Sequence, residues 1–421
     1  MTHATLRMTR SIRSPRWVAL LACSLAAACA GQDPAGNVNG SGGTSTGPGT
    51  GGAAAQAGAD TQGGAGGADT SSTGLGGTNA GGSATGGAGV GGSTGCVDTC
   101  PFANGITWQC KKRFFYGLNQ AWVNFAGDFG GGTRGIAANT SRVGTLFQDY
   151  SNNGASVIRW WVWPNFTGGG VAFTGNNATG LKSTTLADLE ALMKLADQYN
   201  LHLQLTLFSF DNFKTTTNPN LAAIATDAAA RAAIVANAIR PLARAAQASA
   251  YAKRVISWDV INEPEWAVSG AGVNGDQAFT PDTTCTTITQ PQMATLLKDV
   301  VAGLRAESQA LITIGNSAMK WKNAWMAVDQ DFYTFHIYDW VQQYWPYNTS
   351  PAGYGISAKP VVMGEFPPAG FNNGAITYAT IMSSWYSNGY AGGLPWQDSS
   401  MVINFASFKA FADQHPCETR Y

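Results

Sequence analysis

From residue 113 onward, short apolar runs rich in β-formers alternate with longer stretches of helical periodicity. The short runs predict strands at 114–123, 157–163, 202–209, 255–262, 311–316, 332–338, 360–366 and 391–396. The longer stretches predict helices at 141–152, 185–199, 227–250, 290–308, 376–387 and 405–414. Eight strands, most of them followed by a helix, favour an α/β fold of the (β/α)8 TIM-barrel type over an open doubly wound sheet.

Three of the predicted connections are long, and each follows the C-terminal end of a strand. They cover residues 164–183, 266–289 and 339–358. Barrel enzymes build their sites from the loops at this end of the strands, and long loops in compact domains are often functional. The second and third connections carry Trp266, Trp340, Tyr344, Trp345 and Tyr347, which we expect to wall a groove.

The first thirty residues have the pattern of an export signal. Residues 1–16 are basic and free of acids, and residues 17–30 (WVALLACSLAAACA) form an apolar run too short to span a membrane. Small residues before Cys29 resemble a bacterial lipoprotein processing site, with Cys23 as a second candidate for the lipid anchor. Plain signal cleavage is the alternative. We therefore expect an exported protein, either a bacterial cell-surface lipoprotein or a secreted one.

Residues 31–95 cannot form a core. They hold 25 of the 52 glycines and contain no Lys, Arg or aromatic residue. We expect a disordered Gly/Ala/Ser/Thr linker, followed by one catalytic domain at residues 96–421.

Composition excludes some partners. The chain has 25 Lys+Arg against 25 Asp+Glu and only 12% charged residues, with 11% aromatic residues. Without a basic stripe, nucleic-acid binding is not expected. A surface with few charges and many aromatic rings suits neutral, hydroxyl-rich partners.

Five cysteines follow the linker, and an exported protein meets oxidising conditions, so we expect disulfides. Cys100 with Cys110 would close a small loop, and Cys96 with Cys417 would tie the ends of the domain. The odd count leaves one thiol unexplained, and the connectivity cannot be deduced from the sequence.

Two apolar strands end on a carboxylate. Residues 257–264 (SWDVINEP) end the fourth predicted strand with Glu263, and residues 360–366 (PVVMGEF) end the seventh with Glu365. A carboxylate is a poor core residue but is well placed in the mouth of a barrel. Asn-Glu-Pro by itself is a weak signal, whereas the two glutamates at strands four and seven are a strong one.

In these features the chain resembles the large clan of retaining (β/α)8 glycoside hydrolases, most closely the cellulase and mannanase type of glycoside hydrolase family 5. The resemblance implies that Glu263 is the acid/base, that Glu365 is the nucleophile and that Asn262 holds the 2-hydroxyl of the sugar. The reaction itself requires the same arrangement. Hydrolysis that retains the configuration of the anomeric carbon needs two nearby carboxyls with different pKa values, so that one is protonated and the other ionised. One departure is residues 209–212 (SFDN) after strand three, where many members of the family place a histidine.

Three further residues fit this resemblance. Arg159, a charge inside an apolar strand, would keep Glu365 ionised; an ordinary ion pair with Asp259 or Asp149 is the alternative. His336 and Tyr338 are two apart on a strand and therefore point to one face. The resemblance implies that Tyr338 bonds to the nucleophile and that His336 contacts the substrate or the acid/base.

Aromatic side chains complete the expected site. Trp396 ends strand eight, where the clan has a sugar platform, and Trp266, Trp340 and Trp345 are further candidates for substrate binding. Asn119 and Trp122 after strand one could add contacts. Four other tryptophans are expected in the core, namely Trp258, Trp321, Trp325 and Trp385.

The sequence thus predicts a retaining, endo-acting glycoside hydrolase that cleaves a β-1,4-linked polysaccharide of the mannan or cellulose type. An exo-acting β-glycosidase and a non-catalytic glycan-binding barrel are the alternatives. We expect a monomer whose partner is the polysaccharide, with no metal or organic cofactor, because two carboxyls suffice for the reaction.

Overall fold

A computed structural model describes residues 97–398 and 400–421 of the chain. The predicted signal segment and linker, with Cys23, Cys29 and Cys96, lie outside the described residues. Within them, no helix is both long and apolar enough to cross a membrane.

Eight parallel strands close into a barrel, as the sequence predicts. In order around the barrel they are β3 (Phe115–Asn119), β4 (Val157–Trp161), β7 (His202–Ser209), β8 (Val255–Asn262), β11 (Leu311–Asn316), β12 (Tyr333–His336), β13 (Val361–Glu365) and β16 (Gly392–Gly393). Almost every strand residue is buried, because neighbouring strands and helices cover both faces. All eight C-terminal ends therefore meet at one end of the barrel.

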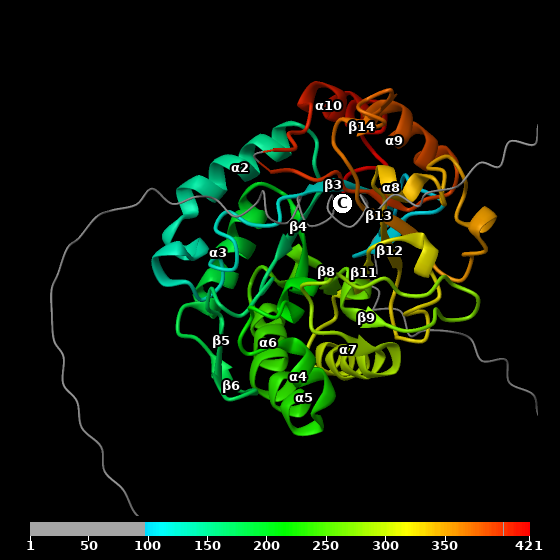
Figure 1. Ribbon diagram of the computed structural model, residues 1–421. Coiled ribbons are helices and arrows are strands. Elements are labelled where there is room, and N and C mark those ends of the chain that lie inside the picture. The colour runs from blue at the N-terminus through cyan, green and yellow to red at the C-terminus, as the bar shows by residue number, and fades with distance from the viewer. Residues whose placement is uncertain (1–96, 399) are drawn as a thin grey trace, which may run out of the picture. The chain divides into compact units, whose positions relative to one another are not determined.

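Helices surround the strands (Figure 1). The longer ones are α2 (Thr140–Asn152), α3 (Thr185–Gln198), α5 (Ala228–Ile234), α6 (Arg240–Ala248), α7 (Gln290–Arg305), α9 (Tyr378–Ser387) and α10 (Phe405–Gln414). In α7, Met293, Leu297 and Leu304 share one face and are fully buried or nearly so. This spacing is that of a helix with one apolar stripe against a sheet.

One predicted helix is interrupted. In place of a single helix at 227–250, the structure has α5, a π-helical segment at Val235–Ile239 and then α6. Pro241 stands in the first turn of α6 and has no N–H to donate to the preceding turn. The helix therefore widens just before the proline.

The long connections have secondary structure of their own. Residues 164–183 contain the hairpin of β5 (Val171–Thr174) and β6 (Asn177–Leu181). In 266–289 the short strands β9 (Val268–Ser269) and β10 (Ile288–Thr289) pair, and 339–358 begins with α8 (Asp339–Gln342).

The sequence left the disulfide connectivity open, and the pairing of Cys100 with Cys110 that it offered is not the one formed. Cys100 bonds to Cys417 across 317 residues of sequence, and Cys110 is in a disulfide as well. The two ends of the domain meet through backbone contacts, since Phe114 N donates to Glu418 O at 2.7 Å. Short spacing in sequence favoured the pair of Cys100 with Cys110, but this tertiary contact puts Cys100 beside Cys417 instead.

Candidate active site

Glu263 and Glu365 both stand at the C-terminal ends of barrel strands. Glu365 is the last residue of β13, and Glu263 directly follows β8. Glu263 has a left-handed backbone (φ 51°, ψ 52°), and its N–H donates to Gly315 O at 2.6 Å. A left-handed conformation costs a non-glycine residue about 1–3 kcal/mol, and such strain clusters at functional sites.

The two carboxylates lie close together with His336 between them. One oxygen of Glu263, one of Glu365 and a ring nitrogen of His336 all lie within 4.8 Å of one another. His336 Nδ1 is 2.8 Å from Glu263 Oε1 and 3.6 Å from Glu365 Oε2. Carboxyl separations of about 5–5.5 Å belong to retaining glycosidases, and inverting ones need about 6.5–9.5 Å. Two carboxylates and an imidazole at this spacing could also hold a metal ion, although the retaining reaction needs none.

Arg159 ties the nucleophile candidate to the barrel interior. The guanidinium donates to Glu365 Oε1 at 2.6 Å and, through two nitrogens, to Asp259 Oδ2 at 2.9 and 2.7 Å. Its other bonds go to Asn119 Oδ1 at 2.9 Å and Asn262 Oδ1 at 2.8 Å, so all five N–H groups are used. Both of the expected ion pairs, with Glu365 and with Asp259, are therefore present together.

The alternative partner Asp149 is not involved in this network, since it lies on the outer helix α2 and accepts from Asn153 just after that helix. Asp259 was expected only as an alternative partner for the arginine. It is fully buried and also accepts from the N–H of Gly315 at 2.8 Å and from Thr206 Oγ1 at 3.1 Å. Asp259 thus holds Arg159 in position for Glu365.

Tyr338 reaches the other oxygen of the nucleophile candidate. Its hydroxyl donates to Glu365 Oε2 at 3.0 Å. Burial raises the pKa of Tyr338 well above its usual range, so the hydroxyl stays protonated and can donate. Burial also raises the pKa of Glu365, and the positive charge of Arg159 opposes that rise. Two donors on two oxygens favour the ionised carboxylate.

Glu263 lies in a different environment. Burial raises its pKa to about 7, although the hydrogen bond that Trp266 Nε1 donates to Oε2 at 2.8 Å lowers it. No arginine bonds to this carboxyl in the described part of the chain. A carboxyl with this pKa can carry a proton near neutral pH and release it, which is what an acid/base must do.

His336 is neutral at neutral pH, because burial lowers its pKa to about 4. Its Nδ1 bonds to the acid/base candidate, and its buried Nε2 has no hydrogen-bond partner among the described residues. Gly364 makes room for this ring, since a Cβ there would lie 2.2 Å from Thr334 Cγ2 and 3.2 Å from His336 Cδ2.

Asn262 and Asn119 flank the arginine. The side-chain oxygen of Asn262 accepts from Arg159, which turns the amide and leaves its Nδ2 as a donor. Asn119 Nδ2 donates to the carbonyls of Gly364 and Leu394 at 2.8 and 2.9 Å. Asn119 thus joins β3 to the strands that carry Glu365 and Trp396.

Trp396 stands in a cluster of three indoles. Trp122, Trp161 and Trp396 have ring centroids 5.2–5.8 Å apart in edge-to-face arrangements. The guanidinium of Arg159 lies 5.6 Å from the ring of Trp161, so the cluster adjoins the network of the nucleophile candidate. Trp161 was not predicted, because it reads as one more apolar residue at the end of strand two.

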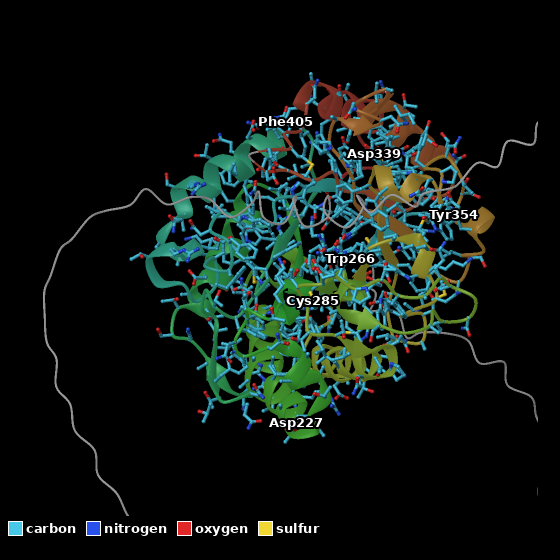
Figure 2. The ribbon with its side chains drawn as sticks, in the orientation of Figure 1. Asp227, Trp266, Cys285, Asp339, Tyr354 and Phe405 are labelled. Atoms are coloured by element: carbon cyan, nitrogen blue, oxygen red, sulfur yellow. A yellow bond between two sulfur atoms is a disulfide. The ribbon has the colours of Figure 1, made fainter. Side chains whose placement is uncertain are left out.

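Trp266 and Trp340 form a second aromatic group. Their ring centroids are 5.6 Å apart, and Trp266 bonds to Glu263. Trp345 instead packs on Tyr354, with ring centroids 4.3 Å apart, and Figure 2 shows Tyr354 towards the outer edge of the domain, whereas Trp266 lies near the centre. The structure therefore brings Trp266 to Glu263 and packs Trp340 on Trp266, whereas Trp345 packs on Tyr354 instead.

The four tryptophans expected in the core are buried, with Trp258, Trp321, Trp325 and Trp385 each at most 1% exposed. Glu265 is also buried, and its oxygens accept from Ser317 N and Trp325 Nε1. Glu265 thus has a bonding environment separate from that of Glu263.

Fold and site define a class: a (β/α)8 barrel with the paired-carboxylate site of a glycosidase. No protein-family model matches the chain. The chain is similar in sequence to the mannan endo-1,4-beta-mannosidase of Mytilus edulis, with 25% identity over 74% of this chain and 91% of the relative. The mannan endo-1,4-beta-mannosidase of Cryptopygus antarcticus is 26% identical over 69% of this chain and 81% of that protein.

Solved structures are also similar to this chain. The X-ray structure of β-mannanase from the blue mussel Mytilus edulis matches with a TM-score of 0.63 and 20% identity, covering 73% of this chain and 93% of that one. The predicted barrel and the predicted resemblance to mannanase-type glycoside hydrolases are confirmed.

Proposed function

We propose that this protein is an endo-acting β-1,4-mannanase that retains the configuration of the anomeric carbon. The observation that carries the proposal is the pair of Glu263 and Glu365, held within 4.8 Å of each other at two strand ends. The different environments of the two carboxyls support different roles, since Arg159 donates to Glu365 and not to Glu263.

In the first step Glu365 is the nucleophile. Its ionised oxygen attacks the anomeric carbon while Glu263 gives its proton to the glycosidic oxygen. The bond from the anomeric carbon to that oxygen breaks, and the shortened chain leaves with the proton. A covalent glycosyl ester on Glu365 remains.

In the second step Glu263 is a base. Its carboxylate takes a proton from water, the water oxygen attacks the anomeric carbon, and the ester bond to Glu365 breaks. Two inversions give net retention. His336, bonded to Glu263 Oε1, orients the carboxyl that gives and then takes the proton.

Substrate binding draws on the remaining site residues. Asn262 Nδ2 is a donor for a sugar hydroxyl, and Trp396, packed edge to face against Trp122, is the candidate ring on which a sugar stacks. The named activity of the two sequence relatives favours mannan over cellulose as the polysaccharide.

The test is release of reducing sugar from mannan, glucomannan, cellulose, xylan and galactan, with product sizes read by chromatography. Glu263→Ala and Glu365→Ala should each lose at least about 10²-fold in turnover. The exposed Glu190 provides the control variant Glu190→Ala, which should keep full activity. Proton NMR of the first products should show the β-anomer.

Other outcomes identify the alternatives. Monosaccharide as the only early product would point to an exo-acting glycosidase. Binding of mannan without cleavage by the wild type would point to a glycan-binding barrel. Near-wild-type hydrolysis by either glutamate variant would overturn the residue roles.

We also propose that the protein is exported and held at a bacterial cell surface by a lipid on Cys29. The basic start, the apolar run and the small residues before that cysteine support this. Labelled palmitate should be incorporated into the wild type and not into Cys29→Ser. Label that persists in Cys29→Ser and disappears in Cys23→Ser would move the anchor.

A further inference from the structure

Lys320 lies against the aromatic group beside Glu263. It belongs to the short helical turn Met319–Trp321 after β11. Its Nζ is 3.8 Å from the ring centroid of Trp321 and 5.0 Å from that of Trp340. Both rings lie 5.6 Å from the ring of Trp266, whose N–H bonds to Glu263. One indole therefore separates this ammonium from the acid/base.

The donors of Lys320 are unused. Among the residues that the structure describes, its Nζ has no hydrogen-bond acceptor and no acid within 4 Å. The charge of Glu265 raises the pKa of Lys320, but the two oxygens of Glu265 accept hydrogen bonds from Ser317 N and Trp325 Nε1. An ammonium carries three N–H donors, and two ring faces do not satisfy them.

The ammonium is charged and open to a ligand. Burial lowers the pKa of Lys320 to about 8, which still leaves it mainly protonated at pH 7. The side chain is half-buried, and its Nζ is not one of the fully enclosed polar atoms without a partner. Such a donor can reach an incoming hydroxyl.

The two aromatic groups adjoin different carboxyls of the site. The cluster of Trp396 and Trp161 adjoins Arg159, which bonds to the nucleophile. The group of Trp266 and Trp340 adjoins Glu263, which protonates the oxygen of the departing chain. Lys320, which lies against Trp340, is therefore on the side of the site that faces the departing sugar.

We propose that Lys320 binds the departing sugar by donating hydrogen bonds to its hydroxyl oxygens, beside the ring of Trp340. The inference rests on the proposed function and names a residue that determines specificity on the leaving-group side. It follows that Lys320 matters only for substrates whose leaving group is a sugar.

The experiment compares two leaving groups in Lys320→Met, which keeps an unbranched stem over Trp321 and removes the donors. Mannopentaose has a sugar as leaving group, and 4-nitrophenyl β-mannotrioside has an aryl group without hydroxyls. We expect kcat/KM to fall about 10-fold for mannopentaose, the scale of one hydrogen bond from a charged donor, and to stay unchanged for the aryl glycoside.

Lys322 offers the matched control. It stands two residues on, its ammonium donates to Tyr354 O, and it lies 5.6 Å from the ring of Trp345. Lys322→Met should leave the ratio of the two kcat/KM values at its wild-type level. Thermal melting of both variants checks the fold.

An equal fall on both substrates would show that Lys320 acts through the fold or through Glu263, and would overturn the proposal. Unchanged kcat/KM for mannopentaose would also overturn it. If the wild-type protein cleaves neither β-mannoside, the proposed function is wrong and this inference is wrong with it. That result is obtained before any variant is made, so it is distinguishable from a failure of this inference alone.

Discussion

Removing the hydroxyl of Tyr338 should shift the acid limb of the pH profile. That hydroxyl donates to Glu365 Oε2 at 3.0 Å, and Tyr338→Phe keeps the ring while removing the donor. Arg159 still bonds to the other oxygen. The variant thus tests a single contact to the ionised nucleophile.

The magnitude follows from that contact. A hydrogen bond to a charged group contributes about 1.5–3 kcal/mol, and one pKa unit corresponds to about 1.36 kcal/mol. The donor stabilises the carboxylate, so its loss should raise the pKa of Glu365 by about one to two units. Because Glu365 must be ionised to attack, activity should be lost at correspondingly higher pH.

The assay is kcat/KM for mannopentaose against pH. The wild type should show a bell whose alkaline limb lies near pH 7, where Glu263 loses the proton that it must donate. In Tyr338→Phe the acid limb should move up and the alkaline limb should stay. Tyr344, 48% exposed on the same connection, gives the control Tyr344→Phe with an unchanged bell.

An acid limb that stays in place in Tyr338→Phe would refute the reasoning, because the hydroxyl would then not stabilise the ionised nucleophile. A shift of the alkaline limb alone would assign the contact to the acid/base. Equal loss at every pH would indicate damage to the fold.

Three further changes have separate outcomes. Gly364→Ala places a Cβ 2.2 Å from Thr334 Cγ2, so we expect a loss of about 1–3 kcal/mol in unfolding free energy, measured by denaturant titration; unaltered stability would contradict the close approach. Trp396→Ala should lower kcat/KM for mannan about three- to tenfold by loss of stacking, and wild-type kinetics would remove it from the site. Cys417→Ser opens the bond to Cys100 and should cost about 2–5 kcal/mol, seen as a lower melting temperature that reductant changes less than it changes that of the wild type, since the disulfide of Cys110 remains.

Much of the barrel could be predicted from the sequence. Each of the eight predicted strands contains an observed one, from β3 at Phe115–Asn119 to β16 at Gly392–Gly393. A strand that is buried on both faces needs a continuous run of apolar residues, and such a run is visible in the local sequence. The exception at 235–239 arises where Pro241 removes a backbone donor.

The candidate site divides in the same way. Glu263 and Glu365 could be predicted, because a charge at the end of an apolar run is visible in the sequence. The sequence offered the partners of Arg159 as alternatives, whereas the structure has Asp259 and Glu365 bound together. A guanidinium with five donors can satisfy two acids, but only the fold shows which acids face it.

By itself the sequence determined the order of strands and helices and the strand ends on which the two glutamates stand. Only the tertiary structure decided that Cys100 meets Cys417, that Trp161 joins Trp396, and that Trp345 packs on Tyr354. The periodicity of apolar residues and the polarity at strand ends are local properties of the chain, and so they can be recognised in the sequence. Contacts between distant residues depend on how the barrel closes and in which register its strands pair.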